Sequence, residues 1–483
     1  SLPVGLITDV GYPVGVPVSF MDIVPLFAFM FRPFSSLLPQ PFQYQGIWML
    51  FCFIMQGAVG YKLSKEVVKK NSLALISTLF LVASPIMIYR VAGHSALVAH
   101  WLILGAMYLV VKYRDQFPLG LWILALVLRV LIHPYIFFMI GPIMVVHLFE
   151  LWWKEEVSLS KISQYFLLQV IVVVGISYIV GLFYIGSSGT SGFGKYSMNL
   201  NSLFNPYWGN WSPIMPNFHT GRYQYEGFSY LGLGMISLLL FSFISSLWHL
   251  SVEKIKDFFA NYWFYFVLSV LFVIFAIGPI VMYGNKVLLE IEVPTVLNNL
   301  LGTVRASGRF IWPVYYVLFL LAVLGLKKRG TIIAIILGVA FFSFQIYDLS
   351  PYLWGREQPK FEDKHWELSL PDYWNELKED YEHIVFIPTY PKNKELKKSS
   401  YSDLVFTAAM NDMTINTAYI SRPIKGKNQH ILKQETRLKQ GNYAKDSIYI
   451  ILPKKKELID KEDENDLVKE EGEYILFVPD YYK

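Results

Sequence analysis

The chain has 483 residues and a formal net charge of +5, with 54% hydrophobic, 17% aromatic and only 16% charged residues. Soluble domains carry about 25% charged residues, so this composition excludes an ordinary soluble protein and predicts an α-helical polytopic membrane protein. The only cysteine, Cys52, lies in an apolar run, which excludes a disulfide framework and a thiolate metal site. We expect no nucleic-acid partner.

The first segment, residues 1–45, combines prolines, glycines and aromatic residues. It starts at Ser1 without a basic leader, so we interpret the chain as a fragment that lacks its own beginning. The stretch MDIVPLFAFMF is too short to span a membrane and predicts an interfacial helix that starts near Asp22. Asp22 is expected either to cap this helix or to act chemically, and Asp9 either to form a turn or to act chemically.

Ten apolar runs predict membrane-spanning helices within residues 46–348. They are residues 46–63, 73–90, 95–111, 119–133, 135–150, 164–186, 229–248, 262–282, 311–326 and 330–347. The two short runs around RVLIHPYIFF are alternatively one kinked element, whose kink His133 would stabilise.

Lysine and arginine residues gather in alternate short connections, which predicts that these connections are cytoplasmic. Counting ten spans then places four segments on the opposite, extracytoplasmic face. They are residues 1–45, the long loops 187–228 and 283–310, and the tail 349–483.

The stretch RVAGHSALVAHW places Arg90 and His94 at the outer end of a helical hairpin. His94 is read either as a hydrogen-bond donor near a site or as a buried structural residue. His94 and His100 are six residues apart, so they do not share a helix face as a pair of metal ligands four residues apart would.

Loop 187–228 is much longer than a connection between neighbouring spans requires, and it is rich in aromatic and amide side chains. Such side chains suit sugars, which offer apolar ring faces and a rim of hydroxyl groups. We therefore expect Asn205, Trp208 and Tyr225 to contact a sugar or an acceptor. The alternative is an aromatic belt at the membrane surface, which requires no ligand.

Both long loops end in charged pairs at the mouth of an apolar run. Arg222 and Glu226 stand four residues apart in GRYQYEGF, a spacing that allows a local ion pair if a helix begins early. Arg305 and Arg309 have the same spacing in VRASGRFIWPVYY. Guanidinium groups fit phosphate oxygens, so Arg222, Arg305 and Arg309 are candidate ligands for a lipid phosphate, with Glu226 as a candidate sugar ligand. The alternative is arginines that reach ordinary lipid headgroups.

The tail, residues 349–483, changes character. HIVFIP, SIYIILP and EYILFVP are short β-type runs, and YSDLVFTAAMND and KKELIDKEDENDLVKE are compatible with helices. This pattern predicts a small α/β domain. It lacks a glycine-rich turn between strand and helix, so we expect the tail to cover or shape a site and not to carry the chemistry.

GHSALVAHW, GRYQYEGFSYLGLG and RASGRFIWPVYY, in this order, resemble motifs of a bacterial family of polytopic membrane proteins grouped with the GT-C glycosyltransferases. The resemblance covers most of the membrane region and fades in the tail. It implies a bacterial cytoplasmic membrane protein with a catalytic acid in its first outer loop, where this chain has Asp22 and Asp9. It also implies a polyprenyl-phosphate sugar as donor and a glycan acceptor.

The resulting hypothesis is transfer of a sugar from a lipid phosphate to a cell-envelope acceptor on the extracytoplasmic face. Asp22 would act as general base, and Arg305 and Arg309 would hold the leaving phosphate. No acidic pair of the metal-binding type follows the first loop, so we do not claim metal dependence. No cofactor is certain, and a divalent metal stays possible. An oligosaccharide polymerase or ligase and a non-enzymatic lipid-glycan transporter or accessory subunit stay open as alternatives.

Overall fold

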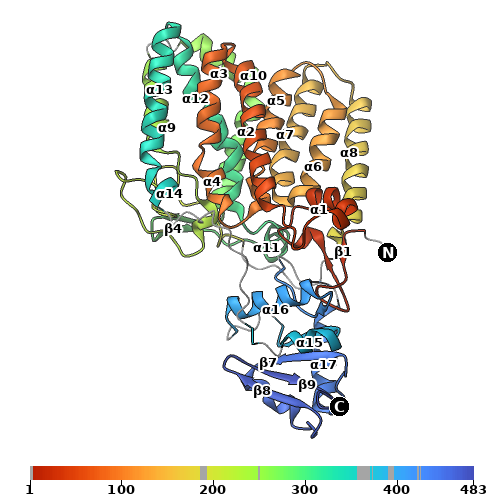
Figure 1. Ribbon diagram of the computed structural model, residues 1–483. Coiled ribbons are helices and arrows are strands. Elements are labelled where there is room, and N and C mark those ends of the chain that lie inside the picture. The colour runs from red at the N-terminus through yellow and green to blue at the C-terminus, as the bar shows by residue number, and fades with distance from the viewer. Residues whose placement is uncertain are drawn as a thin grey trace. The chain divides into compact units, whose positions relative to one another are not determined.

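The computed structural model describes residues 4–184, 193–247, 251–355, 370–371, 374–389, 396–420, 424 and 426–483. It is mostly helical and divides into two compact units (Figure 1). The helical unit comprises Gln43–Ile176 and Gly189–Lys360. The sheet unit comprises Ser1–Phe42, Ser177–Ser188 and Phe361–Lys483. The N-terminal segment and the tail therefore fold together.

The helical unit is built from long apolar helices joined by short turns. Its helices are α2 (Gln45–Val68), α3 (Asn71–Val82), α4 (Pro85–Val91), η3 (Ser95–Val98), α5 (Trp101–Lys112), α6 (Leu119–Ile132), α7 (Pro134–Trp153), α8 (Leu159–Ile179), η5 (Gln224–Gly227), α9 (Leu233–Leu247), α10 (Val252–Ile277), α11 (Thr295–Gly302), η6 (Ser307–Ile311), α12 (Trp312–Lys327), α13 (Thr331–Asp348) and α14 (Ser350–Gly355). The last residues of α8 belong to the sheet unit.

Seven helical segments of the described residues are long and apolar enough to cross a membrane. They are Gln45–Val68, Ser95–Lys112, Pro134–Trp153, Leu159–Ile179, Val252–Ile277, Ser307–Lys327 and Thr331–Asp348. The pair α3 and α4, bent by 41°, would be an eighth, and α6 and α9 are apolar but shorter. A membrane protein is thus supported, with fewer full-length spans than the ten that we expected.

The chain breaks between α6 and α7 at His133, whose backbone is extended. Its ring nitrogen Nδ1 accepts a hydrogen bond of 3.2 Å from the backbone N–H of Tyr135. His133 therefore caps the start of α7, and proline at the first helical position suits that start. The sequence RVLIHPYIFF forms two helices with a capped junction.

Several basic connections meet at one end of the helical unit. Lys112, the last residue of α5, pairs with Glu66 of α2 at 2.8 Å. Arg114 donates to the backbone oxygen of Asn261 in α10 at 2.7 Å and lies 3.8 Å from Glu150 of α7. Connections that are distant in sequence thus share one end of the helices.

The two long loops contact each other at the other end of the helices, where β4 (Lys286–Glu290), α11 and α14 also lie (Figure 1). The backbone N–H of Leu200 donates to the oxygen of Met282, which lies in β3 (Ile280–Tyr283), at 3.0 Å. The N–H of Gly308 donates to the oxygen of Tyr196 at 3.0 Å. Backbone hydrogen bonds therefore join the loop before α9 to the loop before α12.

Asp348, the last residue of α13, anchors the first of these loops to the helices. Its buried carboxylate accepts hydrogen bonds from Tyr230 Oη at 2.7 Å, from the N–H of Leu233 at 2.8 Å, and from the hydroxyl of Ser212. A buried carboxylate is stable only when it is hydrogen-bonded in this way. Asp348 thus fixes where the loop ends and α9 begins.

The sheet unit contains a five-stranded sheet of order β6-β5-β7-β9-β8. Its strands are β5 (His383–Ile387), β6 (Thr414–Ile415), β7 (Ser447–Ile451), β8 (Leu467–Glu471) and β9 (Tyr474–Val478). Strand β5 is parallel to β6 and β7, and β9 is antiparallel to β7 and β8. The helices are α15 (Trp374–Asp380), α16 (Lys398–Met410), α17 (Lys427–Lys439) and η7 (Pro453–Ile459).

The tail confirms the expected small α/β domain, with one correction. The three β-type runs form β5, β7 and β9, and YSDLVFTAAMND lies in α16. The charged stretch KKELIDKEDENDLVKE is not a helix throughout, because it holds the short η7 and then the edge strand β8. Charged residues on an exposed edge strand are common, since they discourage pairing with other chains.

The N-terminal segment joins this sheet. After the short hairpin of β1 (Leu6–Ile7) and β2 (Val16–Pro17), the stretch that was predicted to be an interfacial helix contains the short helix α1 (Pro25–Phe31), followed by η2 (Arg32–Leu37). Val10 forms a parallel bridge with Ile415 of β6, and the N–H of Tyr12 donates to the oxygen of Ile415 at 2.9 Å.

The close approach of the two long loops depends on Gly308. A Cβ atom there would lie 2.6 Å from Gly227 Cα and 3.0 Å from Met198 N, both backbone atoms. Gly308→Ala is therefore expected to lower the free energy of unfolding by about 1–3 kcal/mol. Gly93→Ala is the control, because a Cβ there meets nothing within 4 Å. Equal thermal stability of the two variants in detergent would contradict this packing.

Candidate functional site

The strongest polar cluster in the helical unit joins three segments that are far apart in sequence. Arg90, at the end of α4, donates from Nη1 to Glu226 Oε2 at 2.8 Å and from Nη2 to the Glu226 backbone oxygen at 3.1 Å. Arg309, in η6, donates from Nε to Glu226 Oε2 at 2.9 Å and from Nη2 to Oε1 at 2.7 Å. Glu226 is thus clamped between two guanidinium groups.

The cluster is buried, with 2% of Arg90, 4% of Glu226 and 5% of Arg309 exposed. Burial alone raises the pKa of the Glu226 carboxyl, but Arg309 and Arg90 outweigh burial and hold this pKa well below its usual range. Glu226 is therefore ionised at neutral pH. Two positive charges and one negative charge leave the cluster with one net positive charge.

Aromatic rings pack against both guanidinium groups. Arg309 lies 4.5 Å from the ring centre of Tyr135, and Arg90 lies 5.3 Å from that of Trp312. The Tyr135 hydroxyl accepts a hydrogen bond of 3.1 Å from the N–H of Ala306. Rings over cations reduce the cost of burying them.

A rim of less buried groups surrounds the cluster. His94 Nε2 lies 3.9 Å from Glu226 Oε1, and 44% of the His94 side chain is exposed. Arg305 is half-buried, with its guanidinium 5.5 Å from the ring centre of Tyr196, and that ring lies 6.1 Å from Tyr225. In the described part of the chain Arg305 has no carboxylate partner. Arg305 therefore places a third cation at the edge of the cluster.

Arg222 lies outside this arrangement, which corrects the expected local ion pair. Its side chain is exposed, and its guanidinium lies 5.6 Å from the ring centre of Tyr223. The early helix that the pair required is absent here, because η5 is a single 3-10 turn that starts at Gln224. Glu226 consequently takes distant partners in place of Arg222.

Asn205 and Trp208 shape their own loop. Asn205 Nδ2 donates to the oxygen of Phe218 at 2.7 Å, and its Oδ1 accepts from the N–H of Phe218 at 3.1 Å. Trp208 Nε1 donates to Thr220 Oγ1 at 3.0 Å. These bonds occupy the polar groups that the sequence assigned to a sugar, whereas Tyr225 does lie beside Glu226.

Asp22 and Asp9 belong to the sheet unit, and both are exposed. Helix α1 begins at Pro25, its N-cap is Val24, and no side chain caps it. Asp22 therefore does not occupy the N-cap position, which lies two residues further along the chain at Val24. The backbone oxygen of Asp9 accepts from the N–H of Ile415 at 2.8 Å, which places Asp9 at the edge of the sheet.

Two models of one protein family together match nearly the whole chain. The family model described as "Domain of unknown function (DUF6311)" matches residues 1–350, and the model "DUF6311 C-terminal domain" matches residues 373–479. The chain belongs to the DUF6311 family. The comparison with curated proteins gives no match.

In this DUF6311 chain, a second polar network runs beneath the cluster between helices. His100 Nδ1 lies 2.8 Å from Tyr316 Oη, which also accepts from Gln56 Nε2 at 3.2 Å. The ring of His100 packs 4.2 Å from that of Trp312, which borders Arg90. The sequence showed these residues only as isolated polar positions in apolar runs, and nothing in their spacing connects them.

A further buried cation, Arg129, lies in α6 within the stretch LVLRVLIHPY. The residue is fully buried, and within the described residues none of its three guanidinium nitrogens has a hydrogen-bond partner. Among the described residues no carboxylate pairs with Arg129, and none of the hydrogen bonds of the cluster involves it.

Two groups of side chains in the sheet unit have their ligand atoms within 4.8 Å of one another, as a metal site requires. They are Glu382, His383 and Asp446, and Asp463, Asp466 and Asp480. The second group already has structural roles, since Asp466 accepts hydrogen bonds from the N–H groups of Asp463 and Asp480. Neither group includes a residue that the sequence assigned to a site.

Glu226→Gln tests the cluster. The change leaves two buried guanidinium groups without a counter-charge, and we expect it to lower the free energy of unfolding by about 3–5 kcal/mol at pH 7. Because the folded pKa is depressed, this stabilisation is complete above the unfolded pKa of about 4.3 and is lost as pH falls through the folded pKa. The stability gap between wild type and variant should therefore narrow as pH falls below about 4.

The control is Glu66→Gln, which removes a carboxylate whose partners Lys69 and Lys112 are largely exposed. An exposed pair contributes little to stability. Thermal unfolding in detergent between pH 3 and pH 7 measures both variants. If the difference in stability between wild type and Glu226→Gln is small, or does not change with pH, Glu226 is not an ionised partner of the two arginines.

Proposed function

We propose that the chain is a membrane glycosyltransferase that moves a sugar from a polyprenyl-phosphate donor to a glycan or other cell-envelope acceptor. The observation that carries this proposal is the buried Arg90–Glu226–Arg309 cluster, which keeps one net positive charge beside the half-buried Arg305. A lipid phosphate brings the negative charge that such a place lacks. The family resemblance of the sequence motifs supports the same reading.

The phosphate would bind between Arg305 and the cluster. Arg309 donates two hydrogen bonds to Glu226, so its Nε and Nη2 groups already have partners. Arg305, by contrast, has no carboxylate partner in the described residues. Glu226 would hold Arg90 and Arg309 in place, and Arg305 would supply the direct hydrogen bonds. The assignment of the phosphate ligand therefore shifts from Arg309 to Arg305.

In the reaction, the acceptor hydroxyl oxygen would bond to the anomeric carbon of the sugar while the bond from that carbon to the phosphate oxygen breaks. The electron pair leaves with the phosphate, whose negative charge grows and is stabilised by Arg305 and the positive cluster. Asp22 would accept the proton of the acceptor hydroxyl as general base. Tyr225 and His94 would border the sugar.

We place this reaction on the extracytoplasmic face of a bacterial cytoplasmic membrane. The long loops and the cluster lie at one end of the helices, and basic residues such as Lys112 and Arg114 lie at the other. Short connections rich in lysine and arginine are usually cytoplasmic.

Arg305→Lys tests the phosphate ligand. Lysine keeps the charge but loses the planar fork, and a hydrogen bond to a charged group contributes about 1.5–3 kcal/mol, so kcat/KM for the lipid donor should fall about tenfold or more. Arg222→Lys is the control, because Arg222 also lies beside a tyrosine ring but its side chain is exposed, outside the buried cluster. Unchanged transfer by Arg305→Lys, with reconstituted enzyme and purified donor, would refute this role.

Asp22→Asn tests the general base. An amide keeps the shape of the side chain but cannot take a proton, so turnover should fall about a hundredfold to ten-thousandfold with thermal stability unchanged. Asp9→Asn, measured beside it, should stay active. If Asp9→Asn is inactive and Asp22→Asn is active, the general base is Asp9. If both variants are active, the mechanism is refuted.

A further inference from the structure

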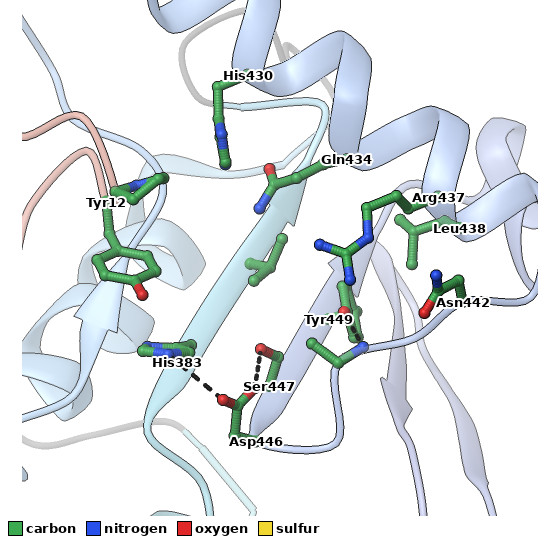
Figure 2. Close-up of a pocket in the computed structure, with 13 residues that line it drawn as sticks. Tyr12, His383, His430, Gln434, Arg437, Leu438, Asn442, Asp446, Ser447 and Tyr449 are labelled. Atoms are coloured by element: carbon green, nitrogen blue, oxygen red, sulfur yellow. Dashed lines mark hydrogen bonds and ion pairs between the residues drawn. The ribbon is translucent and has the colours of Figure 1, made fainter.

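The sheet unit contains a pocket of about 240 Å³ that the proposed transfer does not use (Figure 2). It lies where α17 passes over the starts of β5 and β7, and Tyr12 and Pro13 of the N-terminal segment close one side. Val385 and Tyr449 form its apolar back. Pro13, Leu438 and Ala444 add further apolar lining, and the other lining side chains are polar.

Hydrogen-bond donors without partners converge on this pocket. In the described part of the chain, the Arg437 guanidinium and the Asn442 side-chain amide have no hydrogen-bond partner. Gln434 accepts one hydrogen bond at Oε1 from Asn416, at 3.3 Å, so its amide N–H₂ group is available. His430 Nε2 is buried and unpaired. Figure 2 shows these side chains reaching from α17 and the loop after it towards the pocket.

Two opposite charges line the pocket, the Arg437 guanidinium and the Asp446 carboxylate, and the carboxylate has local polar contacts. Asp446 Oδ2 lies 3.7 Å from His383 Nε2, and Asp446 Oδ1 accepts from Ser447 Oγ at 2.9 Å. Burial lowers the pKa of His430, and Lys433 and Arg437 lower it further, so this ring is neutral at pH 7. Among the described residues that line the pocket, Arg437 is the permanent cation, and its guanidinium has no carboxylate partner in the described part of the chain.

We propose that this pocket binds an acidic monosaccharide unit, that is, one sugar ring that carries a carboxylate or a phosphate. The Arg437 guanidinium suits the oxygens of either anion. The amides of Asn442 and Gln434 suit hydroxyl groups, and Tyr12 adds an aromatic edge, with its ring stacked on His383 at 4.5 Å. The pocket is smaller than the roughly 300–1,000 Å³ typical of drug-sized ligands, so it holds a single ring.

The test measures binding to the full chain in detergent by isothermal titration calorimetry, with glucuronate, glucose 6-phosphate and glucose as probes. At least one acidic probe should bind, and glucose should bind about tenfold more weakly or less, because a hydrogen bond to a charged group contributes about 1.5–3 kcal/mol. Binding of glucuronate alone identifies a carboxylate as the recognised group, and binding of glucose 6-phosphate alone identifies a phosphate.

Arg437→Gln should reduce the affinity for the acidic probe about tenfold or more for the same reason. The Arg437 side chain is exposed, so its replacement does not disturb the core. Lys439→Gln is the matched control, since it removes an exposed cation from the same helix turn outside the pocket and should leave the affinity within about twofold. Equal binding of glucose, absence of binding by both acidic probes, or an unaffected Arg437→Gln would overturn the proposal. The measurement does not involve glycosyl transfer, so either proposal can fail alone.

Discussion

A carboxylate held between two buried guanidinium groups organises the end of the helical unit where the long loops meet. Taking an ion out of water costs several kcal/mol, and this cost is offset only by excellent geometry. Glu226 meets this condition with four hydrogen bonds from Arg90 and Arg309, one of them to its backbone oxygen. The clamp ties α4, η5 and η6 together, so neither long loop can move without exposing or unpairing a buried charge.

The backbone segments on either side of the Glu226 clamp are in close contact. Gly227 follows Glu226 and Gly308 precedes Arg309, and these two glycines touch backbone to backbone. A side chain at either position would push the loops apart and lengthen hydrogen bonds of 2.7–2.9 Å. Arg90 and Arg309 would have to break their ion pairs with Glu226 to bind a ligand. Arg305 lies just outside the clamp and would not.

The sequence predicted the helical membrane architecture and the small tail domain, because hydropathy and turn composition are local signals. It failed where the decisive contact is distant. Glu226 was paired with Arg222 by a spacing of four, yet its partners lie 136 and 83 residues away. Hydropathy also does not show where a helix breaks, so the run 73–90 was read as one span although it bends at Pro85. Strand β8 was missed because its charged residues resemble an exposed helix.

The tail has a clearer role in the fold than its sequence suggested. Val16 and Phe20 of the N-terminal segment share a buried cluster with Ala418 and Ile424 of the tail, and Val10 extends the sheet beside Ile415. The segment that carries Asp22 is therefore held by the tail domain and by the end of α8, where the N–H of Gly5 donates to the oxygen of Ile179. Because a short segment of two-residue strands cannot bury enough surface to fold alone, the position of Asp22 depends on the tail.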